Sequence, residues 1–203
     1  MSTVPNRRMT EAEYLAIERA AERKSEFFAG EMFAMAGVSR AHNLIVTNLI
    51  AELRDQLRKR ECEVYPSEMK VRVLKGGMFA YPDVVVVCGE PQLLDSHGDV
   101  LLNPTLVVEV LSPSTAAYDR GVKAFYYRRL PSLREYVLIE QDRLLVELYQ
   151  RTNDTARKWT VEASDNLADT IKLNSIGCEL TLASIYEKVA LDPNVPPAQD
   201  GLL

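Results

Sequence analysis

Two almost wholly apolar segments restrict the fold of this chain more than any other feature. The first is the run Val84–Val87, and the second is Leu106–Leu111, in which Glu109 is the one polar residue. Short runs of this kind are typical of strands that are buried in a sheet. The chain therefore has to supply helices that cover such a sheet.

Periodicity and capping signals predict the other elements. Thr10 and Glu13 have the spacing of a capping box, which predicts a helix ending near Arg23. A long amphipathic helix is expected from its N-cap Ser39 to about Arg60. Further strands are predicted over 26–35 (a hairpin), 63–65, 69–74, 79–88, 135–140, 144–149, 159–161 and 170–173, a surface loop over 89–103, and helices over 118–129 and 181–189. This order predicts an α/β or α+β fold, a mixed β-sheet core flanked by helices.

Length and composition are those of one globular domain. The 203 residues suffice for one core, assigned to residues 1–191, and residues 192–203, with three prolines, are expected to form a flexible tail. The sequence contains neither an apolar run of the roughly 20 residues that span a membrane nor the apolar stretch of a signal peptide. A cytoplasmic protein without a membrane partner is expected. Cys62, Cys88 and Cys178 lack CxxC spacing and are expected to be reduced core residues.

The net charge of −5 argues against a protein that coats nucleic acid with its whole surface. Local basic faces remain possible. Two groups of basic residues stand out: Arg54, Arg58, Lys59 and Arg60, and then Arg120, Lys123, Arg128, Arg129 and Arg134. Solvated helix faces are the simpler explanation of both groups.

Two acids accompany the apolar segments, Asp83 directly before Val84–Val87 and Glu109 within the second segment. A charged carboxylate in such surroundings is unfavourable unless it is paired, hydrogen-bonded or bound to a cation. If the two strands are neighbours, their carboxylates repel each other, and a hard divalent cation with oxygen ligands resolves both problems. A buried ion pair with arginine or lysine, or one protonated carboxyl group, would resolve them too.

Several short motifs occur in one order along the chain. They are Tyr81-Pro82-Asp83, Val107–Thr115 and Tyr118–Lys123, accompanied by residues 28–31, 39–43 and 133–136. Together, over Met9 to Glu187, they resemble the "putative restriction endonuclease" family of uncharacterised bacterial proteins, which belongs to the PD-(D/E)XK nuclease superfamily.

The resemblance implies a restriction-endonuclease-like fold and an endonuclease that hydrolyses phosphodiester bonds in nucleic acid, with DNA as the expected substrate. It implies Mg²⁺, or Mn²⁺, as the cofactor, held by Asp83, Glu109 and the Val110 carbonyl. A homodimer would let two such sites address both strands of a duplex.

The superfamily's catalytic lysine is missing from its usual place. That position, two residues after Glu109, is Leu111, and the matching lysine is Lys123 on the following helix. A lysine that reaches the same point from another element could still polarise the attacking water. Asp119 and Lys123 are also spaced i to i+4, however, so a plain surface salt bridge is the alternative.

Four further residues are candidates for a supporting role. Glu31 follows a glycine turn and matches an acidic position of the family, where it would complete the metal shell or hold Lys123; an exposed strand-end acid is the alternative. His42 lies in the first turn of a predicted helix, whose free N–H groups favour phosphate; a histidine that simply caps or packs is the alternative. Lys70 is the rival to Lys123. Tyr126 follows Lys123 by three residues on the same helical face, where it would support the site or, alternatively, fill the core.

Two other functions are compatible with these residues. A catalytically inactive nuclease-like module that binds nucleic acid or protein is favoured by the leucine at position 111 and by the acidic net charge. A metal-dependent hydrolase of a small phosphorylated substrate would need no basic groove.

Overall fold

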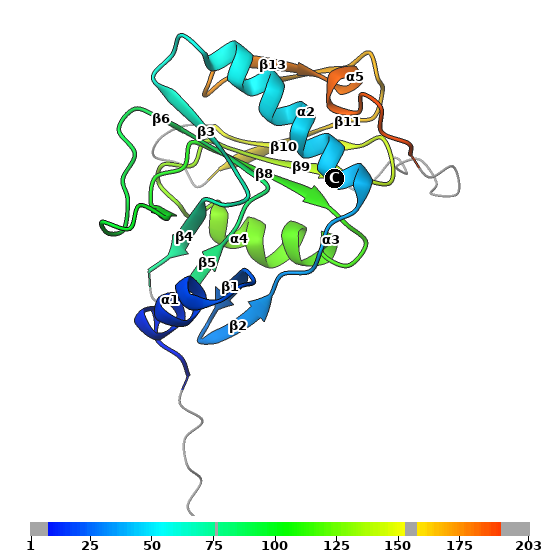
Figure 1. Cartoon of the computed structure of the whole chain (residues 1–203). Coiled ribbons are helices and arrows are strands. Elements are labelled where there is room, and N and C mark those ends of the chain that lie inside the picture. Colours follow the sequence, from blue (N-terminus) through cyan, green and yellow to red (C-terminus); the bar gives the residue numbers. More distant parts are fainter. Residues whose placement is uncertain (1–7, 76, 153–157, 192–203) are drawn as a thin grey trace, which may run out of the picture.

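A mixed six-stranded sheet forms the centre of the computed structural model, which describes residues 8–75, 77–152 and 158–191. Its strands are β3 (Cys62–Pro66), β6 (Val84–Cys88), β8 (Leu106–Leu111), β9 (Glu135–Glu140), β10 (Val146–Arg151) and β11 (Trp159–Ser164). They lie in the order β11-β10-β9-β8-β6-β3 (Figure 1). β8 pairs antiparallel with β6 and parallel with β9, so the two apolar segments are neighbours in the interior of the sheet.

Helices cover both faces of this sheet. On one face, α2 (Arg40–Leu57) packs Ile45, Leu49 and Leu53 against Val84 and Val86 of β6. The other face meets a continuous helical segment made of α3 (Ala116–Tyr118), the π-helix η1 (Asp119–Lys123) and α4 (Ala124–Tyr127). Figure 1 shows α2 and α4 on opposite sides of the strands. Among the described residues, no helix has the length and apolar character needed to cross a lipid bilayer.

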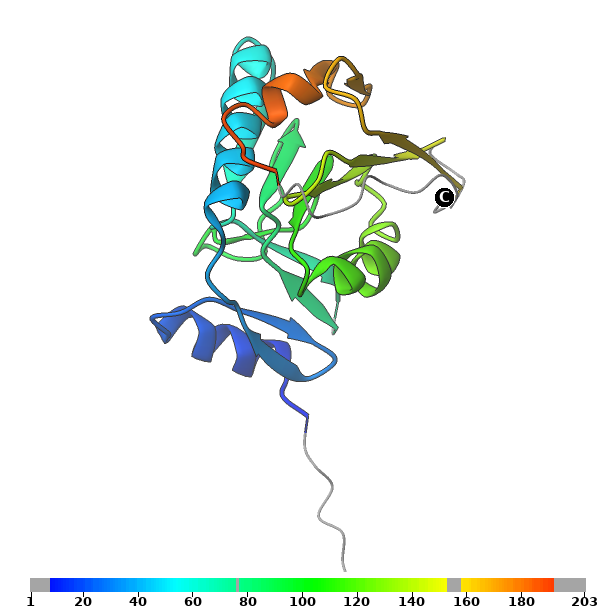
Figure 2. The same ribbon diagram turned by 90° about the vertical axis from the view of Figure 1, so that its right-hand side faces the viewer.

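A second sheet has the order β2-β1-β5-β4-β7 and packs with the N-terminal helix α1 (Glu11–Ala20). Its strands are β1 (Ser25–Phe28), β2 (Glu31–Ala34), β4 (Lys70–Leu74), β5 (Met78–Ala80) and β7 (Val100–Leu101). Both predicted caps are confirmed, the capping box of Thr10 and Glu13 and the Ser39 N-cap of α2. Figure 2 shows α1 and the β1–β2 hairpin at the end of the molecule where α2 begins.

The strand predicted over 79–88 is in fact two strands in different sheets. The break falls at Tyr81-Pro82-Asp83, between β5 and β6. Proline cannot donate a ladder hydrogen bond, and the Tyr81 N–H donates to the Glu26 carboxylate at 3.2 Å. The break therefore frees Asp83 from the strand pairing and turns the chain from one sheet into the other.

Other predictions of the C-terminal half and the loops are partly wrong. Residues 170–173 do not extend the central sheet; β12 (Thr170–Leu173) pairs with β13 (Cys178–Thr181) in a separate hairpin. The closing helix is the short α5 (Leu182–Ile185), and the loop over 89–103 contains β7. The predicted tail over 192–203 lies outside the described residues.

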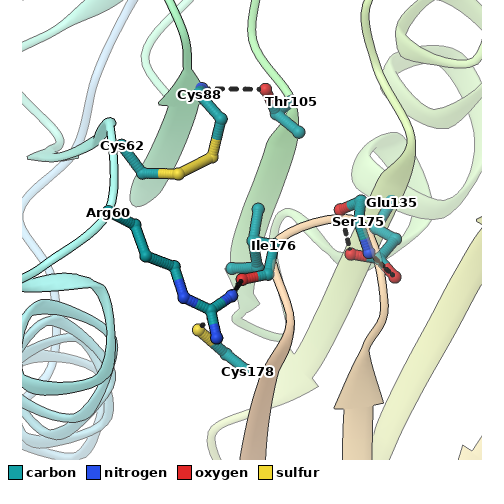
Figure 3. Close-up of a disulfide and its surroundings, with 8 residues drawn as sticks. All are labelled: Arg60, Cys62, Cys88, Thr105, Glu135, Ser175, Ile176 and Cys178. Carbon is teal, nitrogen blue, oxygen red and sulfur yellow. Dashed lines mark hydrogen bonds between the residues drawn. A yellow bond between two sulfur atoms is a disulfide. The ribbon is translucent and has the colours of Figure 1, made fainter.

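The prediction of three reduced cysteines is wrong for two of them. Cys62 and Cys88 lie directly opposite each other in the antiparallel β3–β6 pair and form a disulfide (Figure 3). Figure 3 also shows the guanidinium of Arg60 beside Cys178, where it donates to the Ile176 carbonyl. Cys178 is a buried free thiol, as predicted. The 26-residue separation of Cys62 and Cys88 contains no sign of this pairing, which depends on the strand register.

Candidate active site

Asp83 and Glu109 are brought together by the pairing of β6 with β8. Val84 pairs with Val108 in this antiparallel ladder, and extending the register by one residue sets Asp83 against Glu109. The Val110 N–H donates to Asp83 Oδ2 at 2.7 Å, which fixes one carboxylate on the strand of the other. Both acids are buried, with exposed fractions of 9% and 3%. The expected convergence of the two acids is therefore present.

The two acids line a cavity of about 640 Å³. It lies among the β1–β2 hairpin, the N-terminal turn of α2, the adjacent ends of β6 and β8, and the α3–η1 segment. The carboxylic acids in its wall are Glu26, Asp83, Glu109 and Asp119, and the basic side chains are Lys123 and His42. Four carboxylates thus face one ammonium group and one imidazole.

Lys123 reaches three of these acids. Its Nζ lies 2.9 Å from Glu26 Oε1, 3.2 Å from Asp119 Oδ1 and 3.3 Å from Glu109 Oε1. The predicted i to i+4 pair with Asp119 exists, but both residues are buried, so a surface salt bridge does not describe it. Burial opposes the charge of Lys123, but the carboxylates of Glu109, Glu26 and Asp119 raise its pKa well above the ordinary lysine value. The amine is therefore held as an ammonium ion.

Glu109 experiences the opposite balance. Burial raises its pKa well above the usual range, the charges of Asp119, Asp83 and Glu26 raise it further, and Lys123 opposes them. The Tyr127 hydroxyl donates to Glu109 Oε1 at 3.3 Å. Burial also raises the pKa of Tyr127, which keeps this donor protonated. The positive charge of Lys123 alone is thus not enough to stabilise the ionised form of Glu109.

His42 contacts Asp83 from the first turn of α2. Its Nε2 lies 3.1 Å from Asp83 Oδ1, while its buried Nδ1 has no hydrogen-bond partner within the described ranges. The Ser39 hydroxyl accepts from the His42 N–H at 3.0 Å and donates to Gln141 Oε1 at 2.7 Å. The cap therefore anchors the start of α2 to the end of β9 and sets the imidazole against Asp83.

The acid that the hairpin contributes is Glu26, which the sequence reasoning missed. Glu31, the predicted acid, is exposed at the start of β2 and does not line the cavity. Glu26 is only 12% exposed at its side chain and accepts from both Lys123 and the Tyr81 N–H. The available signal was an acid within the short apolar strand Ser25–Phe28, the same kind of signal that identified Glu109.

Lys70 and Tyr126 do not contribute to this cavity either. Lys70 is fully buried in a second polar cluster, where it pairs with Glu18 of α1 and with Asp99. It is therefore a structural cation of the other sheet. Tyr126 packs its ring against Phe28, and the tyrosine that reaches Glu109 is its neighbour Tyr127. The i+4 position from Lys123, rather than the predicted i+3, faces the site.

The donor set fits a hard divalent cation. In the part of the chain that the structure describes, no three His, Cys, Asp or Glu side chains form a ready-made metal group. Asp83, Glu109 and the Val110 carbonyl instead offer two carboxylates and one backbone oxygen, and Mg²⁺ commonly binds through one or two carboxylates and keeps several waters. The excess of buried carboxylates over cations is the observation that favours such an ion.

Comparison with known proteins identifies the family and the fold of this chain. Residues 11–183 match the model of a family described as "Uma2: Putative restriction endonuclease". Two relatives from Synechocystis sp. (PCC 6803) are both named uncharacterised proteins. The protein sll1609 is 40% identical over 74% of this chain and 84% of its own length, and slr1290 is 34% identical over 93% and 96%.

A solved structure has the same fold. It is described as a putative nuclease belonging to DUF820, from Anabaena variabilis, and it superposes with a TM-score of 0.71 at 17% identity, over 88% of this chain and 97% of that one. The predicted fold class, a mixed α+β fold of the restriction-endonuclease-like type, is confirmed.

Proposed function

This chain belongs to the Uma2 family of "putative restriction endonucleases", and from that premise we propose that it is a metal-dependent nuclease that hydrolyses phosphodiester bonds in DNA. The observation that supports this best is the convergence of Asp83, Glu109 and Lys123 in one cavity. Two carboxylates can hold a metal ion, and an adjacent ammonium group can stabilise charge on a phosphoryl group, so this set suits metal-assisted phosphoryl chemistry.

Mg²⁺ or Mn²⁺ would be held by Asp83, Glu109 and the Val110 carbonyl. When bound, the ion acts as a Lewis acid that lowers the pKa of a water molecule and neutralises charge on the phosphate. Asp83 is pre-oriented for this role because its Oδ2 accepts from Val110 and its Oδ1 lies against His42. Glu109 is oriented by Tyr127 and Lys123.

Lys123 is the proposed catalytic lysine. The carboxylates around its Nζ raise the pKa of Lys123, so the amine keeps its proton. It therefore acts as a hydrogen-bond donor and a positive charge rather than as a base. It can orient the attacking water and stabilise the charge that develops on the phosphate oxygens. Glu26 and Asp119 position this ammonium group beside Glu109.

The inactive binding module is the second candidate, and the leucine at position 111 is what favoured it. Lys123 weakens that argument because its Nζ lies 3.3 Å from Glu109 although it comes from a different element. A lysine at position 111 is therefore not needed to place an ammonium group beside this acid.

The test is a cleavage assay with purified full-length protein on plasmid and on single-stranded, duplex and flapped DNA, with RNA for comparison. We expect cleavage with Mg²⁺ or Mn²⁺, complete loss on adding EDTA, and recovery when the ion is added back. Cleavage that survives EDTA would refute metal dependence. Binding of these nucleic acids without turnover, at any metal concentration, would support the inactive module instead.

A further inference from the structure

The cavity has an apolar wall that the proposed chemistry does not use. It is formed by the segment from Phe33 to Val38, with Phe28 and Tyr118. Phe33 and Val38 are 48% and 52% exposed. Large apolar side chains that stay exposed along the edge of a polar site are a frequent mark of ligand contact.

Phe33 lies next to the acid and lysine cluster. In the β1–β2 ladder, Phe33 pairs with Glu26, so the two side chains lie on one face, with Cβ atoms about 5 Å apart. Glu26 Oε1 in turn lies 2.9 Å from Lys123 Nζ. β2 is the edge strand of its sheet, so this ring is not covered by a further strand. The apolar wall therefore begins at Phe33, and the side chain of Glu26 lies between Phe33 and Lys123.

The side chains that line the cavity do not themselves provide the usual means of binding a nucleic acid. Affinity for a phosphate backbone normally comes from arginine and lysine contacts. Among the described lining residues there is no arginine, and Lys123 and His42 both lie within ion-pair distance of carboxylates. Apart from the proposed ion, a polyanion that enters this acidic cavity therefore needs another source of binding energy. Aromatic side chains supply it by stacking on bases, independently of sequence.

We propose that the cavity takes an unpaired nucleotide, whose base stacks on Phe33 while its phosphate lies at the ion that Asp83 and Glu109 would hold. This deepens the proposed function and rests on it. The substrate class is single-stranded DNA, or an unpaired end or flap of a duplex. Bases in the paired interior of a duplex are already stacked on each other, and they would have to be flipped out to reach this ring.

The test compares Phe33→Ala with Phe125→Ala, a matched control on α4 that is 47% exposed and does not line the cavity. Fluorescence anisotropy with a labelled single strand and with the duplex of the same sequence reports binding without requiring turnover. We expect the wild type to prefer the single strand. Phe33→Ala should weaken that binding roughly 5- to 150-fold, the effect typical of removing one stacking contact, and Phe33→Trp should retain it.

Equal binding of single strand and duplex by the wild type, or no effect of Phe33→Ala beyond that of Phe125→Ala, would overturn this inference. The proposed nuclease function would survive that result if metal-dependent cleavage persists. Conversely, single-strand binding that depends on Phe33, without cleavage of any nucleic acid, would refute the nuclease function and leave the nucleotide site supported.

Discussion

Replacing Asp83 by asparagine or Glu109 by glutamine is expected to lower metal-dependent cleavage about a thousandfold or more. Each change removes one of the two carboxylates that would hold the ion and leaves the shape of the side chain unchanged. A bound metal contributes several kcal/mol of transition-state stabilisation, and each 1.36 kcal/mol corresponds to a factor of ten in rate. The measurement is the initial rate of cleavage at saturating Mg²⁺.

The matched control is Glu31→Gln, the same chemical change at an exposed acid outside the cavity. It should leave the rate unchanged. Loss of fold would be a trivial explanation for lost activity. Glu109→Gln, however, replaces a carboxyl group whose charged form is disfavoured by burial, which raises its pKa. We therefore expect this variant to unfold at the same or a higher denaturant concentration than the wild type. Full activity in Asp83→Asn would contradict the assignment of the site.

The second large effect is expected on stability, from Lys123→Met. Among the described residues, Lys123 is the one lysine within ion-pair distance of the buried acids Glu26, Glu109 and Asp119. Removing one partner of a buried ion pair leaves an uncompensated charge and typically costs about 3–5 kcal/mol. Lys123→Met should therefore lower the free energy of unfolding by about that amount at neutral pH, measured by urea denaturation, and abolish cleavage.

Two further variants make this result interpretable. Lys172→Met removes a lysine whose side chain is 67% exposed and should change stability little, because surface pairs contribute little. The double variant Lys123→Met with Glu26→Gln should recover part of the lost stability, because it removes one of the unpaired acids. A Lys123→Met protein as stable as the wild type would show that the ammonium group of Lys123 does not stabilise the buried acids.

The parts of the site that depend on local sequence pattern could be predicted from the sequence. Asp83 and Glu109 were recognisable because each accompanies an apolar strand, and α2 because its apolar periodicity begins at the Ser39 cap. A carboxylate in a strand that is buried on both faces needs a compensating partner wherever the strand lies. This argument requires no knowledge of the tertiary structure.

The parts that depend on register and on sheet membership could not be predicted. Glu26 and Glu31 belong to the same hairpin, and only the packing of that hairpin decides that Glu26 faces Lys123. Lys70 lies in the other sheet because the chain leaves the central sheet between β3 and β4 and returns to it only after Pro82. The disulfide of Cys62 follows from a strand pairing between segments far apart in sequence.

The most direct test of the central claim is calorimetric titration of Mn²⁺ into the full-length wild type, Asp83→Asn and Glu109→Gln, with Glu31→Gln as control. It requires no knowledge of the substrate. We predict saturable binding by the wild type and by Glu31→Gln, and loss of that binding in both cavity variants. Binding of equal affinity in all four proteins would contradict the claim that Asp83 and Glu109 form the metal centre.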